Sequence, residues 1–292
     1  MATSSQWLEG ARIRTLPAAV SPVLAGSGIA AFEGAFSVPL ALLCLLVALA
    51  LQIGVNYAND YSDGIRGTDA DRVGPMRLVG SGAASPGSVK AAAFACFGVA
   101  ALAGLGLIVL TQLWWLLAVG VAAIAAAWFY TGGKHPYGYL GLGELFVFVF
   151  FGLVAVGGTV LVQAGRTTPA TWAAAVTIGA LACAILVANN LRDLHGDIAA
   201  GKRTLATRLG DRGTRWFFVA LVVVALAGVV IVALLTTGWA LLGLLAVVLL
   251  AGPAREVLAG GAGRALITVL KLVGLAELVA AAGLALGLAI GG

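Results

Sequence analysis

Charged side chains are scarce in this sequence. Only 10% of its 292 residues are charged, whereas a soluble globular domain has about 25%. Hydrophobic residues make up 61% of the chain, and the mean hydropathy is +1.06. The apolar residues form long continuous runs, not the alternating pattern of a barrel strand. The composition therefore excludes a soluble protein and an outer-membrane barrel, and it predicts an all-α polytopic membrane protein.

Cysteine is rare as well, with three residues in the whole chain. Cys44, Cys96 and Cys183 each lie inside an apolar run, and none forms a C-x-x-C pair or neighbours a histidine. Isolated cysteines in such surroundings are typical of small buried hydrophobic side chains. The sequence therefore excludes a disulfide framework and a zinc site.

Nine apolar segments are predicted to cross the bilayer, each close to the roughly 20 residues that an apolar layer of about 30 Å requires. The predicted spans are 15–33, 38–61, 87–110, 113–130, 141–163, 169–194, 214–235, 238–255 and 266–290. The eighth is the least regular, because Gly252-Pro253 interrupts it near its end. We expect one integral-membrane domain over residues 1–292.

The basic residues are distributed unequally between the predicted loops. If the N-terminus is cytoplasmic, all but Arg166 of the 17 lysines and arginines fall on the cytoplasmic side. The positive-inside rule then predicts a multi-pass protein of the cell membrane with its N-terminus inside and its C-terminus outside. The net charge of +5 thus reflects topology. No nucleic-acid partner is expected, and lipid diphosphates or anionic lipid surfaces are the expected acidic partners.

Two short polar runs end two strongly apolar predicted helices. The first holds Asn56, Asn59, Asp60 and Asp63, at spacings of 0, 3, 4 and 7; the second holds Asn189, Asp193 and Asp197, four residues apart. Each set shares one helix face. Carboxylates at a membrane are costly and mark functional sites. Two facing acidic clusters can bind Mg²⁺, and Mg²⁺ can bind a diphosphate, so the pattern predicts chemistry on a lipid diphosphate on the cytoplasmic side.

A diphosphate also needs cationic partners, and basic residues lie close to both acidic runs. Candidates for diphosphate binding, besides the asparagines of the two runs, are Arg66, Arg72, Lys134, Lys202 and Arg203. Arginine can bind phosphate oxygens with two parallel hydrogen bonds, whereas lysine acts as a point charge. Tyr130 and Tyr139 lie near the same boundary, where an aromatic face can stabilise a cation.

Four segments of the chain resemble the UbiA superfamily of intramembrane prenyltransferases, in the form of its naphthoate branch. They are residues 11–28, 52–82 with the first acidic run, 130–152 with a Tyr-x-x-x-Lys element, and 189–210 with the second acidic run. Gly67 and Asn189 stand where the wider superfamily often has aspartate, which is a feature of this branch. The resemblance implies a bundle of nine transmembrane helices around a central cavity.

The resemblance also implies a reaction and roles for these residues. Mg²⁺ bound by Asp60, Asp63, Asp193 and Asp197 would hold a polyprenyl diphosphate. Lys134, Lys202 and Arg203 would neutralise the departing diphosphate, and Tyr130 or Tyr139 would shield the allylic cation. The acceptor would be 1,4-dihydroxy-2-naphthoate, which loses its carboxylate as CO₂. Arg14 or Arg77 is expected to position that carboxylate.

Other functions remain open from the sequence alone. Within the family, 4-hydroxybenzoate, homogentisate or a sugar phosphate could be the acceptor. A secondary transporter also places carboxylates between helix repeats, although its sites lie near mid-membrane. A phospholipid phosphotransferase is disfavoured, because Asp63-Gly64-Ile65-Arg66 departs from the expected Asp-Gly-x-x-Ala-Arg signature. The sequence does not predict an oligomeric state or the prenyl chain length.

Overall fold

The computed structural model describes residues 2–67 and 76–292, and all regular secondary structure in these residues is helical. The helices, in chain order, are α1 (Ser4–Gly10), η1 (Ile13–Thr15), α2 (Pro17–Phe32), α3 (Val38–Arg66), α4 (Pro86–Thr111), α5 (Leu116–Phe129), η2 (Tyr137–Leu140), α6 (Gly143–Val147), η3 (Phe148–Val154), α7 (Ala155–Ala164), α8 (Pro169–Arg192), α9 (Leu194–Ala199), α10 (Leu205–Leu235), η4 (Gly238–Leu245), α11 (Ala246–Leu258) and α12 (Arg264–Gly291). The predicted all-α class is confirmed.

The predicted count of nine spans is not confirmed. In the described part of the chain, seven helical segments are long and apolar enough to cross a membrane. An eighth is reached if Ser4–Thr15 and Pro17–Phe32, which meet at a 48° bend, count as one broken span. The predicted span 113–130 contains only the 14-residue helix α5, which is shorter than the roughly 20 residues needed. A multi-pass membrane protein is nevertheless the class that these helices define.

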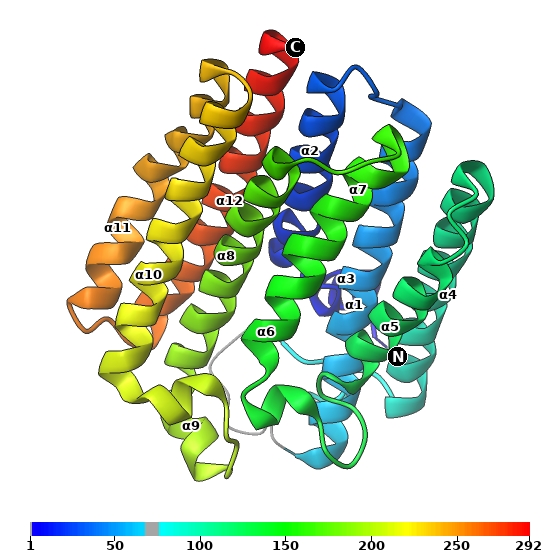
Figure 1. The fold of residues 1–292 in the computed structure, drawn as a ribbon. Helices are drawn as coiled ribbons and strands as arrows, with labels where there is room; N and C mark the ends of the chain where they lie inside the picture. Colours follow the sequence, from blue (N-terminus) through cyan, green and yellow to red (C-terminus); the bar gives the residue numbers. More distant parts are fainter. Residues whose placement is uncertain (1, 68–75) are drawn as a thin grey trace.

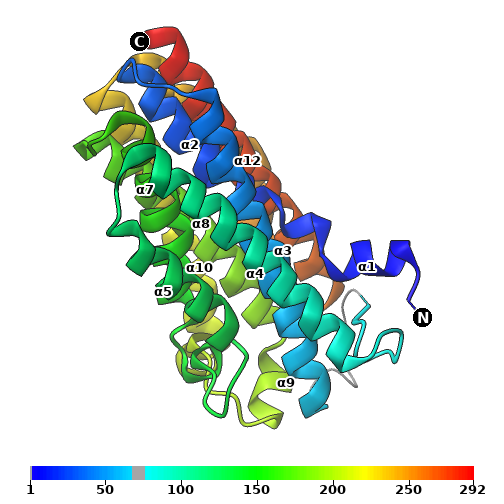
Figure 2. The same ribbon diagram turned by 90° about the vertical axis from the view of Figure 1, so that its right-hand side faces the viewer.

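The helices form two groups, joined by helices that lie between them (Figure 1). On one side α8, α10, α11 and α12 share a core of small and branched apolar side chains, centred on Leu181, Phe218 and Val273. On the other side α3, α4 and the loop before α4 pack around Ala58, Leu78 and Phe97, with α5 against them. Helix α1 projects from the side of the bundle (Figure 2). Helices of both groups, α8 and α12 of the first and α3, α4 and α5 of the second, contribute residues to the wall of one cavity.

The ends of several helices follow from local sequence. Thr168 forms a capping box with Thr171 at the start of α8, and Pro169 occupies its first turn. Gly67 ends α3 in the left-handed conformation with φ +71°, which glycine adopts without strain. Gly210 has φ 69° and ψ 177° and breaks α10 near its start, four residues before the predicted start of this span at residue 214. Helix α3 runs five residues beyond its predicted end.

Helices α2 and α12 approach so closely that a glycine is required between them. A Cβ atom at Gly28 would lie 2.5 Å from the Cα atom of Ala285, where no side-chain movement can relieve the overlap. Close contacts at small residues are the common basis of helix association in a bilayer. This contact fixes α2 against α12 and thereby sets one wall of the bundle.

We therefore expect Gly28→Ala to lower the free energy of unfolding by about 1–3 kcal/mol, the usual cost of overpacking a close contact. Gly98→Ala in α4 is the matched control, because no atom lies within 4 Å of a Cβ atom added there. Thermal unfolding in one detergent would compare the two variants with the parent protein. Equal melting temperatures for Gly28→Ala and Gly98→Ala would contradict the packing argument.

Candidate active site

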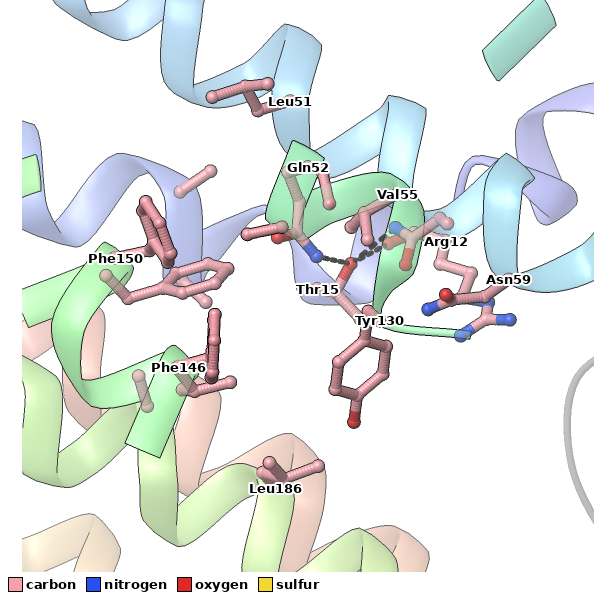
Figure 3. Close-up of a pocket in the computed structure, with 18 of the residues that line it drawn as sticks. Arg12, Thr15, Leu51, Gln52, Val55, Asn59, Tyr130, Phe146, Phe150 and Leu186 are labelled. Atoms are coloured by element: carbon pink, nitrogen blue, oxygen red, sulfur yellow. Dashed lines mark hydrogen bonds between the residues drawn. The ribbon is translucent and has the colours of Figure 1, made fainter. Parts of the chain in front are cut away.

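One large cavity contains most of the polar residues that the sequence singled out. Its volume is about 2060 Å³, and its wall includes Asn59, Asp63, Asp193 and Asp197 together with many apolar side chains. The polar residues come from the end of α3, the α8–α9 junction and the loop around η2. The structure thus brings both acidic runs to one cavity. Figure 3 shows part of its wall, where polar side chains of α3 and η1 lie opposite aromatic ones.

Asp60 does not line this cavity. It is 1% exposed, and its two carboxylate oxygens accept the backbone N–H groups of Leu78 (2.8 Å) and Val79 (2.9 Å). These bonds attach the segment before α4 to the end of α3. In the arrangement described here, Asp60 therefore organises the loop beside the cavity.

Asp63 lies on the cavity wall between a phenol and a guanidinium. The hydroxyl of Tyr139 donates to Asp63 Oδ1 at 2.5 Å, and Nη2 of Arg77 lies 3.7 Å from Asp63 Oδ2. Burial raises the pKa of Tyr139 above its usual range, and the Asp63 carboxylate raises it further. The phenol therefore remains protonated at neutral pH and acts as a hydrogen-bond donor to Asp63.

The second acidic run lies where α8 ends and the short helix α9 begins. The guanidinium of Arg192 donates two hydrogen bonds of 2.7 Å to the carboxylate of Asp193, and a third of 2.9 Å to Asn189 Oδ1. Nζ of Lys202 lies 3.3 Å from Asp197 Oδ1. All five side chains line the cavity. Arg192 was not among the predicted site residues, although its position beside Asp193 and one turn from Asn189 was a sequence signal.

Tyr139 connects the two acidic runs. Its hydroxyl contacts Asp63, while Nζ of Lys202 lies 4.7 Å from the centre of its ring. The guanidinium of Arg66 lies 5.6 Å from the same ring and donates to the backbone carbonyls of Thr131 and Gly133. Arg66 is exposed and absent from the cavity wall, and it connects the end of α3 to the loop after α5.

Several predicted site residues lie elsewhere. Lys134 and Arg203 are exposed and do not line the cavity, although the backbone N–H of Arg203 bonds to the carbonyl of Tyr139. Arg72 lies outside the described residues. Arg14 is exposed but lines the cavity. The sequence could not show which of these basic residues line the cavity, because it does not specify the direction of a loop side chain.

Three further predicted residues are buried or half-buried at the cavity. Arg77 lies on its wall with its guanidinium directed to Asp63, and Tyr130 lies there with its ring 5.5 Å from that of Tyr137. Asn56 is 3% exposed, and its amide nitrogen donates to the backbone carbonyl of Ala11 at 2.9 Å. Asn56 is thus engaged with the chain at the α1–α2 bend.

A series of aromatic rings runs from the polar end of the cavity into its apolar part. The sequence analysis did not predict this series. Tyr137 stacks on Phe146 with ring centroids 4.0 Å apart, and Phe146 stacks on Phe150 at 6.1 Å. Phe150 lies in η3, a π-helical segment at Phe148–Val154. Such π-helical turns are common at functional sites and redirect side chains. The apolar run around these residues was visible in the sequence, but the π-helical turn was not.

The donor atoms at the polar end suit a hard divalent cation. In the described part of the chain, no three His, Cys, Asp or Glu side chains gather into a metal-binding group. Mg²⁺ does not need such a cage, because it is usually held by one or two carboxylates together with waters and phosphate oxygens. The carboxylates of Asp63, Asp193 and Asp197 therefore fit Mg²⁺ that is shared with a phosphate ligand.

Comparison with known proteins identifies the family. A model of the UbiA prenyltransferase family matches residues 19–260. The chain belongs to the UbiA prenyltransferase family. This membership covers both acidic runs, the loop around η2 and the π-helical segment of the cavity wall.

Similar proteins support the family and the fold. The 1,4-dihydroxy-2-naphthoate octaprenyltransferase of Mycobacterium tuberculosis is 56% identical over 100% of this chain and 99% of its own length. A UbiA homolog from Aeropyrum pernix, solved in its apo form, has a TM-score of 0.72 and 17% identity, covering 91% of this chain and 96% of its own. A UbiA homolog from Archaeoglobus fulgidus, solved with GPP and Mg²⁺, has a TM-score of 0.66 and 13% identity, covering 96% and 99%.

The contacts of Asp60 lead to a stability difference that can be measured. We expect Asp60→Ala to lower the free energy of unfolding by about 2–4 kcal/mol, because one buried and one half-buried N–H group lose their acceptors. Asp211→Ala is the control: Asp211 is paired with Arg215 on an exposed part of α10, and such pairs contribute about 0–1 kcal/mol. Equal melting temperatures of the two variants in detergent would contradict the role of Asp60 at the loop.

Proposed function

We propose that this protein transfers a polyprenyl group from polyprenyl diphosphate to 1,4-dihydroxy-2-naphthoate, with Mg²⁺ as cofactor and with loss of CO₂. The supporting observation is the meeting of both acidic runs, with their basic partners, at one end of a large and mostly apolar cavity. Family membership supports the reaction class, and the name of the M. tuberculosis relative supports the acceptor. The A. fulgidus homolog solved with GPP and Mg²⁺ supports the donor and the metal.

The diphosphate would bind between the two acidic runs. Asp63 on one side, and Asp193 and Asp197 on the other, would hold Mg²⁺, which supplies positive charge to the diphosphate oxygens as the leaving group departs. Arg192 and Lys202 lie beside these carboxylates, so they are well placed to bind the diphosphate itself. Arginine at such a position can bind two phosphate oxygens at once.

The reaction breaks the bond between the prenyl C1 atom and the diphosphate oxygen, and the electron pair leaves with the diphosphate. The electron-rich ring carbon that carries the carboxylate then forms a bond to C1. The bond to the carboxylate carbon breaks and returns its electrons to the ring, so CO₂ departs and demethylmenaquinol remains. Tyr130 and Tyr139 line the cavity beside this position, where their ring faces would stabilise the allylic cation.

The apolar part of the cavity would hold the prenyl chain and keep water from the cation. Phe146 and Phe150 continue the wall from the tyrosines into the region formed by α4, α5 and α7. Water capture of the cation would give a prenyl alcohol, so exclusion of water is a requirement of transfer. From the distribution of basic residues we propose that this polar end faces the cytoplasm in the cell membrane.

The direct test uses membranes that contain this protein, 1,4-dihydroxy-2-naphthoate, a polyprenyl diphosphate and Mg²⁺. We expect a prenylated and decarboxylated naphthoquinol by mass spectrometry, and its loss when EDTA removes the metal. A parallel reaction with 4-hydroxybenzoate tests the acceptor. Product from 4-hydroxybenzoate alone would contradict the acceptor, and no product from any aromatic acceptor would contradict the reaction.

Substitutions at the second acidic run test the diphosphate site. We expect Asp193→Asn and Asp197→Asn each to reduce turnover by about 100-fold or more, since each removes a charge that would hold the metal and diphosphate. Asp211→Asn is the control, because Asp211 carries the same carboxylate outside the cavity. Near-normal turnover in either cavity variant, with normal membrane insertion, would contradict this assignment.

A further inference from the structure

The bend between α1 and α2 has an unusual backbone. Arg12, which follows α1 and precedes η1, adopts the left-handed conformation with φ 54° and ψ 60°. A long side chain seldom occupies this region, where glycine and asparagine are common. Such a conformation persists only when its surroundings enforce it, and it is frequent at ligand sites. Arg12 lines the cavity, and its guanidinium has a favourable charge interaction with Asp60.

A network of hydrogen bonds from α3 enforces this backbone. Asn56 Nδ2 donates to the carbonyl of Ala11 at 2.9 Å and to the hydroxyl oxygen of Thr15 at 3.0 Å. The Thr15 hydroxyl in turn donates to the carbonyl of Arg12 at 2.9 Å. Asn56 and Thr15 together therefore hold the two peptide carbonyls on either side of the left-handed residue.

The same network determines the orientation of the Gln52 amide. The Thr15 hydroxyl donates its only proton to the Arg12 carbonyl. Towards Gln52, the Thr15 hydroxyl oxygen can therefore only accept, and Nε2 of Gln52 donates to it at 2.9 Å. Oε1 of Gln52 is left buried, and within the described residues it has no hydrogen-bond partner. Gln52 is 8% exposed and lines the cavity, and Figure 3 shows it beside Thr15 on the wall that includes Arg12.

A ligand that contacts both Arg12 and Gln52 needs two chemical features. A guanidinium binds an anion, whereas a buried amide oxygen needs a hydrogen-bond donor. A fully ionised diphosphate offers only acceptors and cannot satisfy Gln52, and a prenyl chain offers neither feature. An aromatic acid with a ring hydroxyl offers both.

We propose that the prenyl acceptor binds at the α1–α2 bend, with its carboxylate on Arg12 and a ring hydroxyl donating to Oε1 of Gln52. This proposal rests on the proposed function and adds the acceptor subsite to it. Arg14, the residue expected from the sequence, is exposed at the edge of the cavity, and Arg77 is directed to Asp63. Thr15 and Asn56 are positioning residues that act through Arg12 and Gln52.

The contact between the acceptor carboxylate and Arg12 is tested by equilibrium binding to the purified protein, measured under reducing conditions. The ligands are 1,4-dihydroxy-2-naphthoate and 1,4-dihydroxynaphthalene, which lacks the carboxylate. We expect Arg12→Asn to weaken binding of the naphthoate by about tenfold or more and to leave the naphthalene unchanged. Asparagine tolerates the left-handed backbone, and Arg12→Lys, which keeps the charge, should restore part of the affinity. Arg255→Asn, on an exposed part of α11, is the matched control.

The hydrogen bond between a ring hydroxyl and Oε1 of Gln52 is tested with 2-naphthoate, which keeps the carboxylate but lacks both hydroxyls. We expect Gln52→Leu to reduce the preference for 1,4-dihydroxy-2-naphthoate over 2-naphthoate by about fivefold or more. A general loosening of the bend would weaken both ligands equally and would overturn this part. Gln163→Leu is the matched control, because Gln163 lies outside the cavity and bonds to Ser27 and Thr159.

Turnover separates this proposal from the proposed function. If the parent protein makes product, Arg12→Asn should raise the KM for the naphthoate and leave the KM for the prenyl diphosphate unchanged. A rise in the prenyl diphosphate KM alone, or unchanged naphthoate affinity in Arg12→Asn and Arg12→Lys, would overturn the acceptor subsite. If the parent protein makes no product, the proposed function fails, while carboxylate-dependent and hydroxyl-dependent binding would still support the subsite.

Discussion

The pairing of carboxylates with cations at one end of the cavity is the constraint on which the site depends. Three acid–base pairs, Asp63 with Arg77, Asp193 with Arg192 and Asp197 with Lys202, lie at the cavity wall. A charge withdrawn from water without a partner is strongly destabilising, so each acid of the site requires its base. The same pairs concentrate both signs of charge where a metal diphosphate, which also carries both signs, would bind.

This pairing also joins parts of the chain that are distant in sequence. Tyr139, in the loop between α5 and α6, contacts Asp63 through its hydroxyl and Lys202 through its ring. The end of α3 is thereby connected to the loop after α9. Beyond the polar end the wall becomes aromatic and then aliphatic, as a substrate with a diphosphate head and a hydrocarbon tail requires.

Sequence composition and periodicity were sufficient for the all-α class and for most residues of the two acidic runs, but not for the number of spans. The 3.6-residue repeat places Asn59 and Asp63 on one face, and the structure has both on the cavity wall. It could not show that Asp60, on the same face, bonds to the backbone of a later loop. It also could not show the left-handed residue Arg12 or the π-helical segment at Phe148–Val154. These features depend on tertiary contacts that local sequence does not specify.

In the proposed function, one diphosphate bridges the two acidic runs through Mg²⁺. Binding of a non-reactive prenyl thiolodiphosphate to the purified protein, with and without Mg²⁺, tests it most directly. We expect Mg²⁺-dependent binding that is weakened by at least about tenfold in both Asp63→Asn and Asp197→Asn, because each removes a carboxylate from one side of the bridge. Binding that is independent of Mg²⁺, or that is unaffected by loss of one run, would contradict it.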